Sequence, residues 1–189
     1  MQADSESGIR AAAVIGSVRE GNFTSQAVRV IADEFAVSHP EAIADPAHLN
    51  LSGPGLEEEG DAQIVQDILN PATAIILSTP EYHRSYSSVI KRVIENLGFP
   101  SGLSGKPVGL LGVAAGRIGA IKSLEHPSSV VTHVLPGSVS VANVQDAFED
   151  GKCTDAETEK RLRGLATNVM DYVHQFICPR ISMEAVAPG

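Results

Sequence analysis

The sequence has little cysteine and no tryptophan: Cys153 and Cys178 are the only cysteines in 189 residues. They form no CxxC pair and no cluster with histidine, so a disulfide framework, a zinc site and an iron–sulfur site have little support, and we expect no bound metal. Low use of cysteine is typical of a reducing compartment, and we expect a cytoplasmic protein. No run approaches the roughly 18 apolar residues of a membrane-spanning helix, and the polar start "MQADSESG" lacks the features of a signal peptide. We therefore expect no membrane partner.

Basic residues are also few, with 14 Lys and Arg against 23 Asp and Glu, which gives a net charge of −9. Nucleic acids attract cationic surfaces, so we expect no nucleic-acid partner. The acidity does not exclude a small anionic ligand, because one local site can oppose the overall charge. With 43% hydrophobic and 20% charged residues, the chain has the composition of a globular protein with a sizeable core.

Four or five apolar runs alternate with helix-like stretches along the chain. We expect strands within 9–16, 41–45, 72–78, 105–115 and 138–144, and helices over about 22–36, 61–70, 88–98, 118–132 and 154–176. Strands that are apolar on both faces are typical of a parallel sheet covered by helices. The pattern predicts an α/β fold: a flavodoxin-like, doubly wound, five-stranded parallel sheet of order 2-1-3-4-5 in three α/β/α layers.

The pattern fits one domain. We expect a flexible N-terminal arm at 1–8, the domain at 9–176, and a C-terminal extension or oligomer contact at 177–189. Thr154 is a plausible cap of the last helix. Pro127 could break the helix that we expect over 118–132.

Ligands of such sheets bind outside the carboxyl ends of the strands, near the point where the strand order reverses. Three distinctive segments leave the strands there. They are "GSVREGNFT" (16–24), "STPEYHRSYSS" (78–88) and "GVAAGRIGA" (112–120), called below the first, second and third loops.

The first loop ends at the start of a helix, where unpaired backbone amides and the helix dipole favour an anion. Ser17, Asn22 and Thr24 add short donors, and Arg19 adds a planar charged group that suits phosphate. A phosphate monoester is the natural ligand, but an ordinary capped turn is an equally weighted alternative. The loop matches neither the Walker A pattern nor GxGxxG.

The second loop has Pro80 directly after an apolar strand, which we expect to end there. We expect free backbone amides at Glu81, Tyr82 and His83, which could bind the oxygens and nitrogens of a planar heterocycle. Tyr82 could offer a flat apolar face, although packing in a core corner would also explain it.

The third loop consists of small residues, with Arg117 as its one large polar side chain. The small residues would let a ligand approach closely, but a tight helix–strand turn would also explain them. They are Gly112, Ala114, Ala115, Gly116 and Gly119.

Together the three loops resemble the NAD(P)H-dependent FMN reductases with the flavodoxin-like fold. That family has a GSxRxxSxN-type loop after its first strand, a PEYN segment after its third and a Gly-rich loop after its fourth. Here "GSVREGNFT", "TPEYHRSY" and "AAGRIGA" stand in those places. The segment "FEDGKCTDAETEKRLRGLA" is similar to the family's ending, so the resemblance runs from about Ile9 to Val173.

The resemblance implies that the first loop holds the FMN phosphate, the second runs along the isoalloxazine and the third borders its pyrimidine end. Asn22, Thr24 and His83 depart from the family's usual residues, but His83 can still bind through its backbone. The implied cofactor-binding residues are Ser17, Arg19, Asn22, Phe23, Thr24, Pro80, Glu81, Tyr82, His83, Ala114, Ala115, Gly116, Arg117 and Gly119.

The resemblance further implies an enzyme that passes a hydride from NADH or NADPH to FMN, and then reduces free flavin, a quinone or a similar acceptor by a ping-pong mechanism. The flavin does this chemistry, so we expect no catalytic residue. A flavodoxin-like electron carrier is the alternative. Carriers sandwich the flavin between aromatic side chains, however, and this chain has only three Tyr, five Phe and no Trp. A phosphate-binding sensor without redox chemistry is a third possibility.

The family buries part of the helix expected over 88–98 in a dimer, so the resemblance implies a homodimer or homotetramer. The electron acceptor and the choice between NADH and NADPH stay open. A 2′-phosphate would need a basic group near the adenine end, for which Arg84, Arg117 and Lys122 are candidates.

Overall fold

A five-stranded parallel sheet lies at the centre of the computed structural model, which describes residues 9–35, 43–53 and 60–179. The strands follow the order β2-β1-β3-β4-β5. This order and the parallel pairing of every neighbour confirm the predicted doubly wound sheet. The strand bounds are β1 Ala11–Ile15, β2 Ile43–Ala44, β3 Ala74–Pro80, β4 Val108–Val113 and β5 Val139–Val141.

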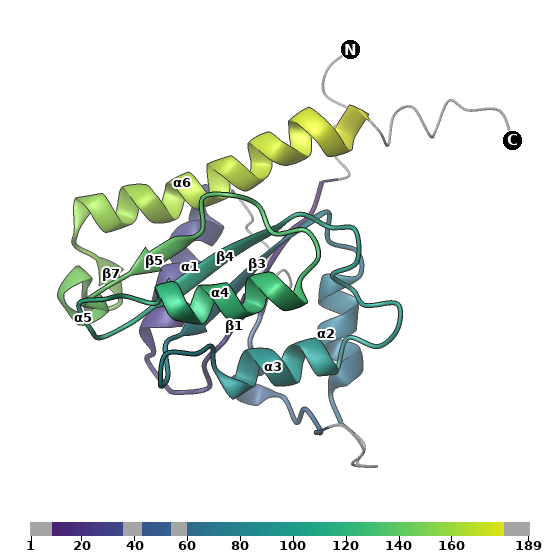
Figure 1. Cartoon of the computed structure of the whole chain (residues 1–189), viewed down its shortest axis with the longest axis horizontal. Coiled ribbons are helices and arrows are strands. Elements are labelled where there is room, and N and C mark those ends of the chain that lie inside the picture. Colours follow the sequence, from purple (N-terminus) through teal and green to yellow (C-terminus); the bar gives the residue numbers. More distant parts are fainter. Residues whose placement is uncertain (1–8, 36–42, 54–59, 180–189) are drawn as a thin grey trace, which may run out of the picture.

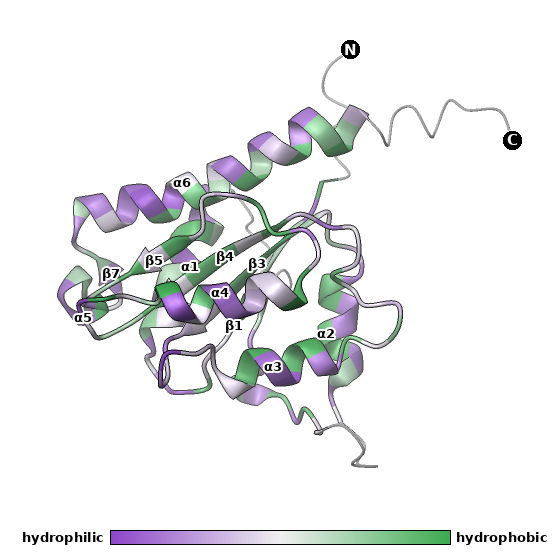
Figure 2. Ribbon diagram, viewed as in Figure 1, coloured by the Kyte–Doolittle hydropathy of each residue, from purple (hydrophilic) through white to green (hydrophobic). Residues whose placement is uncertain are grey.

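Helices cover both faces of the sheet and complete the three layers (Figure 1). Helices α1 and α6 pack on one face, and α2, α3 and α4 pack on the other. Figure 2 shows mostly hydrophobic strands between helices that carry both hydrophobic and hydrophilic residues. The helix bounds are α1 Phe23–Glu34, α2 Ala62–Leu69, α3 Ser88–Glu95, α4 Ile121–Val130 and α6 Ala156–Tyr172.

The three central strands are buried at every position, which explains why their sequences show no alternation of polar and apolar residues. Their alternate side chains point into two separate cores. One core holds Ile31 of α1 and Leu162 of α6, and the other holds Val65 of α2 and Ile90 of α3. The sheet is therefore fixed from both sides, and the loops at its carboxyl edge start from a rigid base.

The last long helix, α6, begins one residue later than a cap at Thr154 would place it. The carboxylate of Asp155 caps α6 by accepting a hydrogen bond from the amide of Thr158 at 2.9 Å. Thr154 instead donates its amide to the carbonyl of Ala147 at 2.9 Å, so the prediction of Thr154 as the cap is wrong. Both residues are good caps, and the contact with Ala147 decides between them.

Pro127 lies inside α4 without ending it. The amide of Val131 still donates to the carbonyl of Pro127 at 3.0 Å, so the helical ladder resumes directly after the proline. Five short elements were not predicted as such, although the last of them continues the helix expected over 154–176. They are η3 (Pro46–His48), α5 (Val144–Ala147), the strands β6 (Phe148–Glu149) and β7 (Lys152–Cys153), which form a hairpin, and the π-helical turn η4 (Val173–Ile177) after α6.

The predicted N-terminal arm and residues 180–189 of the predicted C-terminal extension lie outside the described residues. The domain boundaries at 8/9 and 176/177 stay predictions.

Candidate functional site

The first, second and third loops meet at the carboxyl edge of the sheet. They follow β1, β3 and β4, which are consecutive neighbours in the sheet. The strand register brings their ends together, because Ile15 pairs with Ser78 and Pro80 pairs with Val113. The structure therefore gathers the three segments that the sequence singled out.

The first loop is held by its own polar side chains. Oδ1 of Asn22 accepts the amide of Ser25 at 2.7 Å, which caps α1, and Nδ2 of Asn22 donates to the carbonyl of Arg19 at 2.6 Å. Oγ of Ser17 accepts the amide of Arg19 at 3.4 Å. Both polar atoms of the Asn22 side chain are thus engaged inside the loop. Asn22 shapes the loop and caps the helix, as the alternative of an ordinary capped turn predicted.

The start of α1 keeps the features of an anion site. Its first turn contains no acidic residue, so no side chain offsets the positive end of the helix dipole. Thr24 and Ser17 are buried beside it. Phe23, the first residue of α1, packs at 6.1 Å between ring centroids against Phe148 of the hairpin. The capped turn and an anion site are therefore compatible here.

Gly16 is required by packing within the protein. A Cβ atom at this position would lie 2.2 Å from the carbonyl oxygen of Ser78 and 2.6 Å from Cγ1 of Ile90. Ser87 also donates its hydroxyl to the carbonyl of Gly16 at 2.6 Å. The first loop is thus joined to β3 and to the start of α3, and the ligand is not the reason for this glycine.

An arginine–aromatic contact joins the first and second loops. The guanidinium carbon of Arg19 lies 5.2 Å from the centroid of the Tyr82 ring, within the range of a cation–π interaction. Both side chains are exposed. A planar cation and an aromatic face therefore stand side by side between the two loops.

The second loop turns sharply between Tyr82 and Ser85, whose backbones exchange two hydrogen bonds of 3.0 Å. The two central residues, His83 and Arg84, have φ angles of +50° and +65°. Such left-handed conformations are unfavourable for residues other than glycine and are frequent at functional sites. The carboxylate of Glu81 accepts the amide of Arg84 and helps to hold the turn.

The expectation of three free amides in the second loop is wrong for two of them. The amide of Glu81 donates to Val113 at 2.8 Å, and the amide of Tyr82 donates to Ser85 at 3.0 Å. Only the amide of His83 has no partner among the described residues. Pro80 is the last residue of β3, as expected, and is buried.

The third loop is held by residues from outside it. The hydroxyl of Ser140 accepts the amide of Ala120 at 2.7 Å, and Ala114 exchanges backbone hydrogen bonds with Val141 and Val144. Gly119 has a φ of +73°, and a Cβ there would lie 2.6 Å from Oγ of Ser140.

The glycines of the third loop divide into two kinds. A Cβ at Gly112 would lie 2.5 Å from Cβ of Ala120, so this glycine allows α4 to pack closely on β4. A Cβ at Gly116 would meet nothing within 4 Å. Ala115, Gly116 and Arg117 are all exposed. Gly116 and its neighbours therefore form an open surface that the packing of the protein does not explain.

Cys153 belongs to none of the three loops; it lies in β7 and donates its thiol to the carbonyl of Asp155 at 3.5 Å. Burial raises the pKa of the Cys153 thiol, which disfavours the reactive thiolate. This cysteine is therefore suited to a structural position.

In the parts of the chain that the structure describes, no three His, Cys, Asp or Glu side chains gather as possible metal ligands, and no helix is long and apolar enough to span a membrane.

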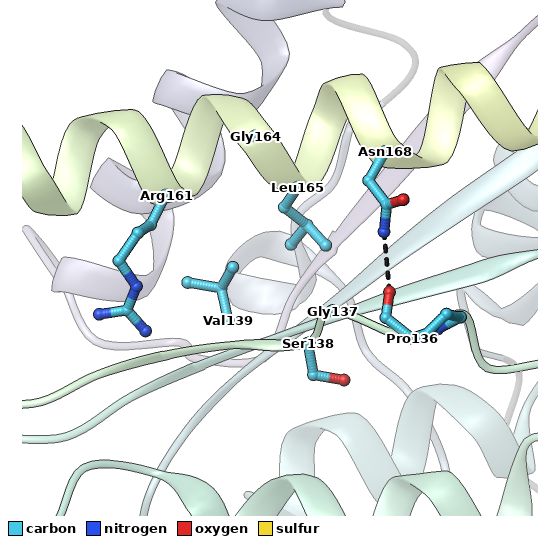
Figure 3. Close-up of a pocket in the computed structure, with 8 residues that line it drawn as sticks. All are labelled: Pro136, Gly137, Ser138, Val139, Arg161, Gly164, Leu165 and Asn168. Carbon is cyan, nitrogen blue, oxygen red and sulfur yellow. Dashed lines mark hydrogen bonds between the residues drawn. The ribbon is translucent and has the colours of Figure 1, made fainter.

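Of two hollows among the described residues, one lies outside the three loops, and the other is lined in part by Val18 of the first loop and Ser88 of the second. A groove of about 540 Å³ runs between α6 and the segment that enters β5, the edge strand (Figure 3). Asn168 donates to the carbonyl of Pro136 at one end, and Arg161 donates to the carbonyl of Ser140, each at 2.7 Å. These contacts cover carbonyls of the sheet edge, which is a usual protection of edge strands. The groove contains no residue of the three loops.

The second hollow is a smaller cavity of about 250 Å³ that adjoins the first loop. It lies between the segment after β2 and the start of α3. Its lining residues are Val18, Pro46, Leu49, Leu51, Ser88, Val89 and Arg92.

Comparison with known proteins agrees with this geometry. Residues 9–149 match the sequence profile of the family described as NADPH-dependent FMN reductase. An FMN-dependent NADPH-azoreductase of Staphylococcus aureus (strain USA300) is 29% identical over 177 residues, which cover 85% of this chain and 93% of the relative.

Two solved structures show the same fold. The flavoenzyme FerB, an NAD(P)H:(acceptor) oxidoreductase from Paracoccus denitrificans, aligns with a TM-score of 0.67 and 22% identity, over 88% of this chain and 98% of FerB. The apo form of the NADH:FMN oxidoreductase EMOB aligns with a TM-score of 0.63 and 17% identity, over 85% of this chain and 90% of EMOB.

Proposed function

We propose that this chain, which belongs to the NADPH-dependent FMN reductase family, binds FMN on its three loops and uses NADPH or NADH to reduce a small-molecule acceptor. Membership of the family makes the chain an oxidoreductase that uses FMN and NAD(P)H. The observation that carries the proposal is the meeting of the three loops on neighbouring strands, with an anion-favouring helix start at one side and an open, small-residue surface at the other.

The residues at this edge fit the parts of FMN. We propose that the amides at the start of α1, with Ser17, Arg19 and Thr24, bind the phosphate, while Asn22 and Phe23 hold the loop in shape. The exposed guanidinium of Arg19 is free to leave Tyr82 or to bind an anion while it stays against the ring.

The second and third loops would orient the flavin ring. Tyr82 would supply a flat face, and the amide of His83, which has no partner among the described residues, would supply a donor, while Glu81 and Pro80 fix the position of the turn. The small surface of the third loop would border the other end of the ring. The proposed residues there are the exposed Ala115, Gly116 and Arg117, with the buried Ala114 and Gly119 holding the backbone of the loop in place.

When bound, FMN supplies the redox chemistry, taking a hydride from the nicotinamide and passing electrons to the acceptor. The protein's contribution is to hold the reacting molecules in contact and alignment. The nicotinamide and the acceptor would use the same open face in turn, which predicts ping-pong kinetics. Free flavin, quinones and azo compounds are the acceptors we propose, and the relative named as an azoreductase favours testing an azo dye first.

The alternative, an electron carrier without NAD(P)H oxidation, has less support. A carrier would need aromatic side chains on both sides of the flavin. The exposed part of the third loop consists of Ala115, Gly116, Arg117 and Ile118, so Tyr82 has no aromatic counterpart there.

Steady-state kinetics would test this proposal. The FMN-loaded protein is expected to oxidise NADPH or NADH in the presence of a quinone or an azo dye, and double-reciprocal plots at several acceptor concentrations should give parallel lines. Intersecting lines would contradict the ping-pong mechanism alone. No nucleotide oxidation with any acceptor class would favour the carrier.

We further propose that two copies of the chain associate near the site as a homodimer, which could pair again as a homotetramer. Ile118 and Ile121, beside the third loop, are 77% and 58% exposed, and such neighbouring apolar residues often mark an interface. In α3, Ile90 and Val93 are buried in the core of the chain itself, so only the other side of this helix is open to a partner. Light scattering should show a mass of at least twice 19.8 kDa. It should fall toward the monomer in an Ile118→Asp, Ile121→Asp variant, and a wild-type monomer at every concentration would contradict the proposal.

A cytoplasmic location stays a prediction from the sequence.

A further inference from the structure

We propose that the small cavity beside the first loop binds the adenosine end of NADPH, and that Arg92 recognises its 2′-phosphate. This inference rests on the proposed function, because it assigns a position to part of the co-substrate. It adds a nucleotide-specificity site to the three loops, built from η3 and α3.

The size and lining of the cavity suit one end of a dinucleotide. Pockets that hold a whole small-molecule ligand usually enclose about 300–1,000 Å³. This cavity has about 250 Å³, which suits one end of a dinucleotide better than the whole molecule. A flat adenine ring can pack against apolar walls of this kind, with one polar group beside it. Those walls are Val18, Pro46, Leu49, Leu51 and Val89.

Arg92 is the cation of this cavity. Among the described residues its side chain forms no ion pair, whereas the adjacent Lys91 pairs with Glu95. A guanidinium can form two parallel hydrogen bonds to a phosphate, and those bonds are strengthened by its charge. Ser88, at the first position of α3, also lines this cavity and carries a hydroxyl.

The cavity adjoins the proposed FMN site directly. Val18, one of its walls, lies between Ser17 and Arg19 in the first loop. The start of α3 is joined to the same loop, because the hydroxyl of Ser87 donates to Gly16 at 2.6 Å. A dinucleotide with its nicotinamide over the flavin must extend its adenosine beyond the loops, and this cavity receives it on the side of β2.

The three cations that the sequence suggested for this role are placed less well. Lys122 pairs with Glu125 at 2.8 Å, so its charge is already offset. Arg84 and Arg117 are exposed on the second and third loops and line neither of the two hollows.

Calorimetric titration of the FMN-loaded protein with 2′,5′-ADP and 5′-AMP would test the proposal, because the two probes differ only in the 2′-phosphate. The wild type should bind 2′,5′-ADP about tenfold or more tightly than 5′-AMP. Arg92→Gln should remove this difference, and Arg92→Lys should keep part of it. Val89→Trp, which fills the cavity, should weaken both probes.

Arg29→Gln is the matched control, since it removes the same charge from an exposed position on α1. It should leave the preference for 2′,5′-ADP unchanged. FMN affinity should stay the same in Arg92→Gln, and the KM for NADPH should rise while that for NADH does not.

Three results would overturn the inference. One is a wild type that does not distinguish the two probes. Another is that the preference for 2′,5′-ADP over 5′-AMP persists in Arg92→Gln, or that Arg84→Gln abolishes it. The third is an Arg92→Gln variant that loses only the turnover of a sulfonated azo dye, which would assign the cavity to the acceptor. In all three cases, reduction of the bound flavin by NADPH in the wild type would still support the proposed function.

Discussion

The first and third loops lie at the same edge of one sheet, but they are built in opposite ways. The first loop is held by its own side chains, since Asn22 and Ser17 accept or donate hydrogen bonds within it. The third loop contributes almost no side chains: it has an internal backbone hydrogen bond of 3.1 Å from Gly119 to Gly116, and Ser140 holds it from outside. The difference shows how one site can combine a preformed anion cradle with a surface left bare for a flat ligand.

The largest effect should come from the glycines of these two loops. We expect Gly16→Ala to lower the free energy of unfolding by about 3 kcal/mol, because the new methyl group would overlap Ser78 and Ile90. Gly116→Ala should change it by less than about 0.5 kcal/mol, since nothing lies within 4 Å of the added atom. Urea denaturation measures both variants. Equal losses would show that the two loops are packed alike.

The arginines of the two loops should differ next in their effect on FMN binding. Arg19→Ala should weaken FMN by about 10- to 100-fold through loss of a charged hydrogen bond to phosphate. Arg117→Ala should weaken it by less than about fivefold, because this exposed charge is proposed to border the flavin ring and not to pair with the phosphate. Quenching of flavin fluorescence gives both affinities. An unchanged affinity in Arg19→Ala would remove Arg19 from the site.

The smallest effect concerns the helix caps and their response to pH. Hydrogen bonds from Thr158 hold the pKa of the Asp155 carboxyl below its ordinary value. A lowered carboxyl pKa stabilises the fold above the pKa of the unfolded chain, and this contribution is lost as the pH falls through the folded value. The cap of α1, Asn22, does not titrate.

The stability difference between wild type and Asp155→Asn should therefore vanish in acid. The loss in Asn22→Ala, about 1 kcal/mol, should persist over the same pH range. Chemical denaturation at a series of pH values below 5 compares the two variants. Parallel losses at every pH would show that the charge of Asp155 does not contribute to capping.

The sheet was predictable from the sequence because β1, β3 and β4 are apolar at nearly every position, a pattern that few other environments require. The grouping of the three loops followed from the strand order. The cap of α6 was not predictable, because Thr154 and Asp155 are adjacent and equally suitable. The short elements η3, α5 and the β6–β7 hairpin are too brief to leave a periodic pattern.

Within the site, the three loops could be predicted from the sequence, but the role of each residue in them could not. The reason for Gly16 lies in Ser78 and Ile90, which are far from it in the chain. The left-handed turn at His83 and Arg84 could not be predicted, because neither position is a glycine. Arg92 was missed because its cavity is built from three separate segments, around Val18, Pro46 and Ser88, that only the fold brings together.

The central claim is that the three loops hold an FMN that a nicotinamide nucleotide can reduce. An anaerobic visible spectrum of the protein with FMN, taken before and after addition of NADPH or NADH, tests it most directly. We predict a bound flavin whose visible absorption band bleaches at enzyme-like rates with at least one nucleotide. A bound flavin that neither nucleotide bleaches, or no bound flavin at all, would contradict it.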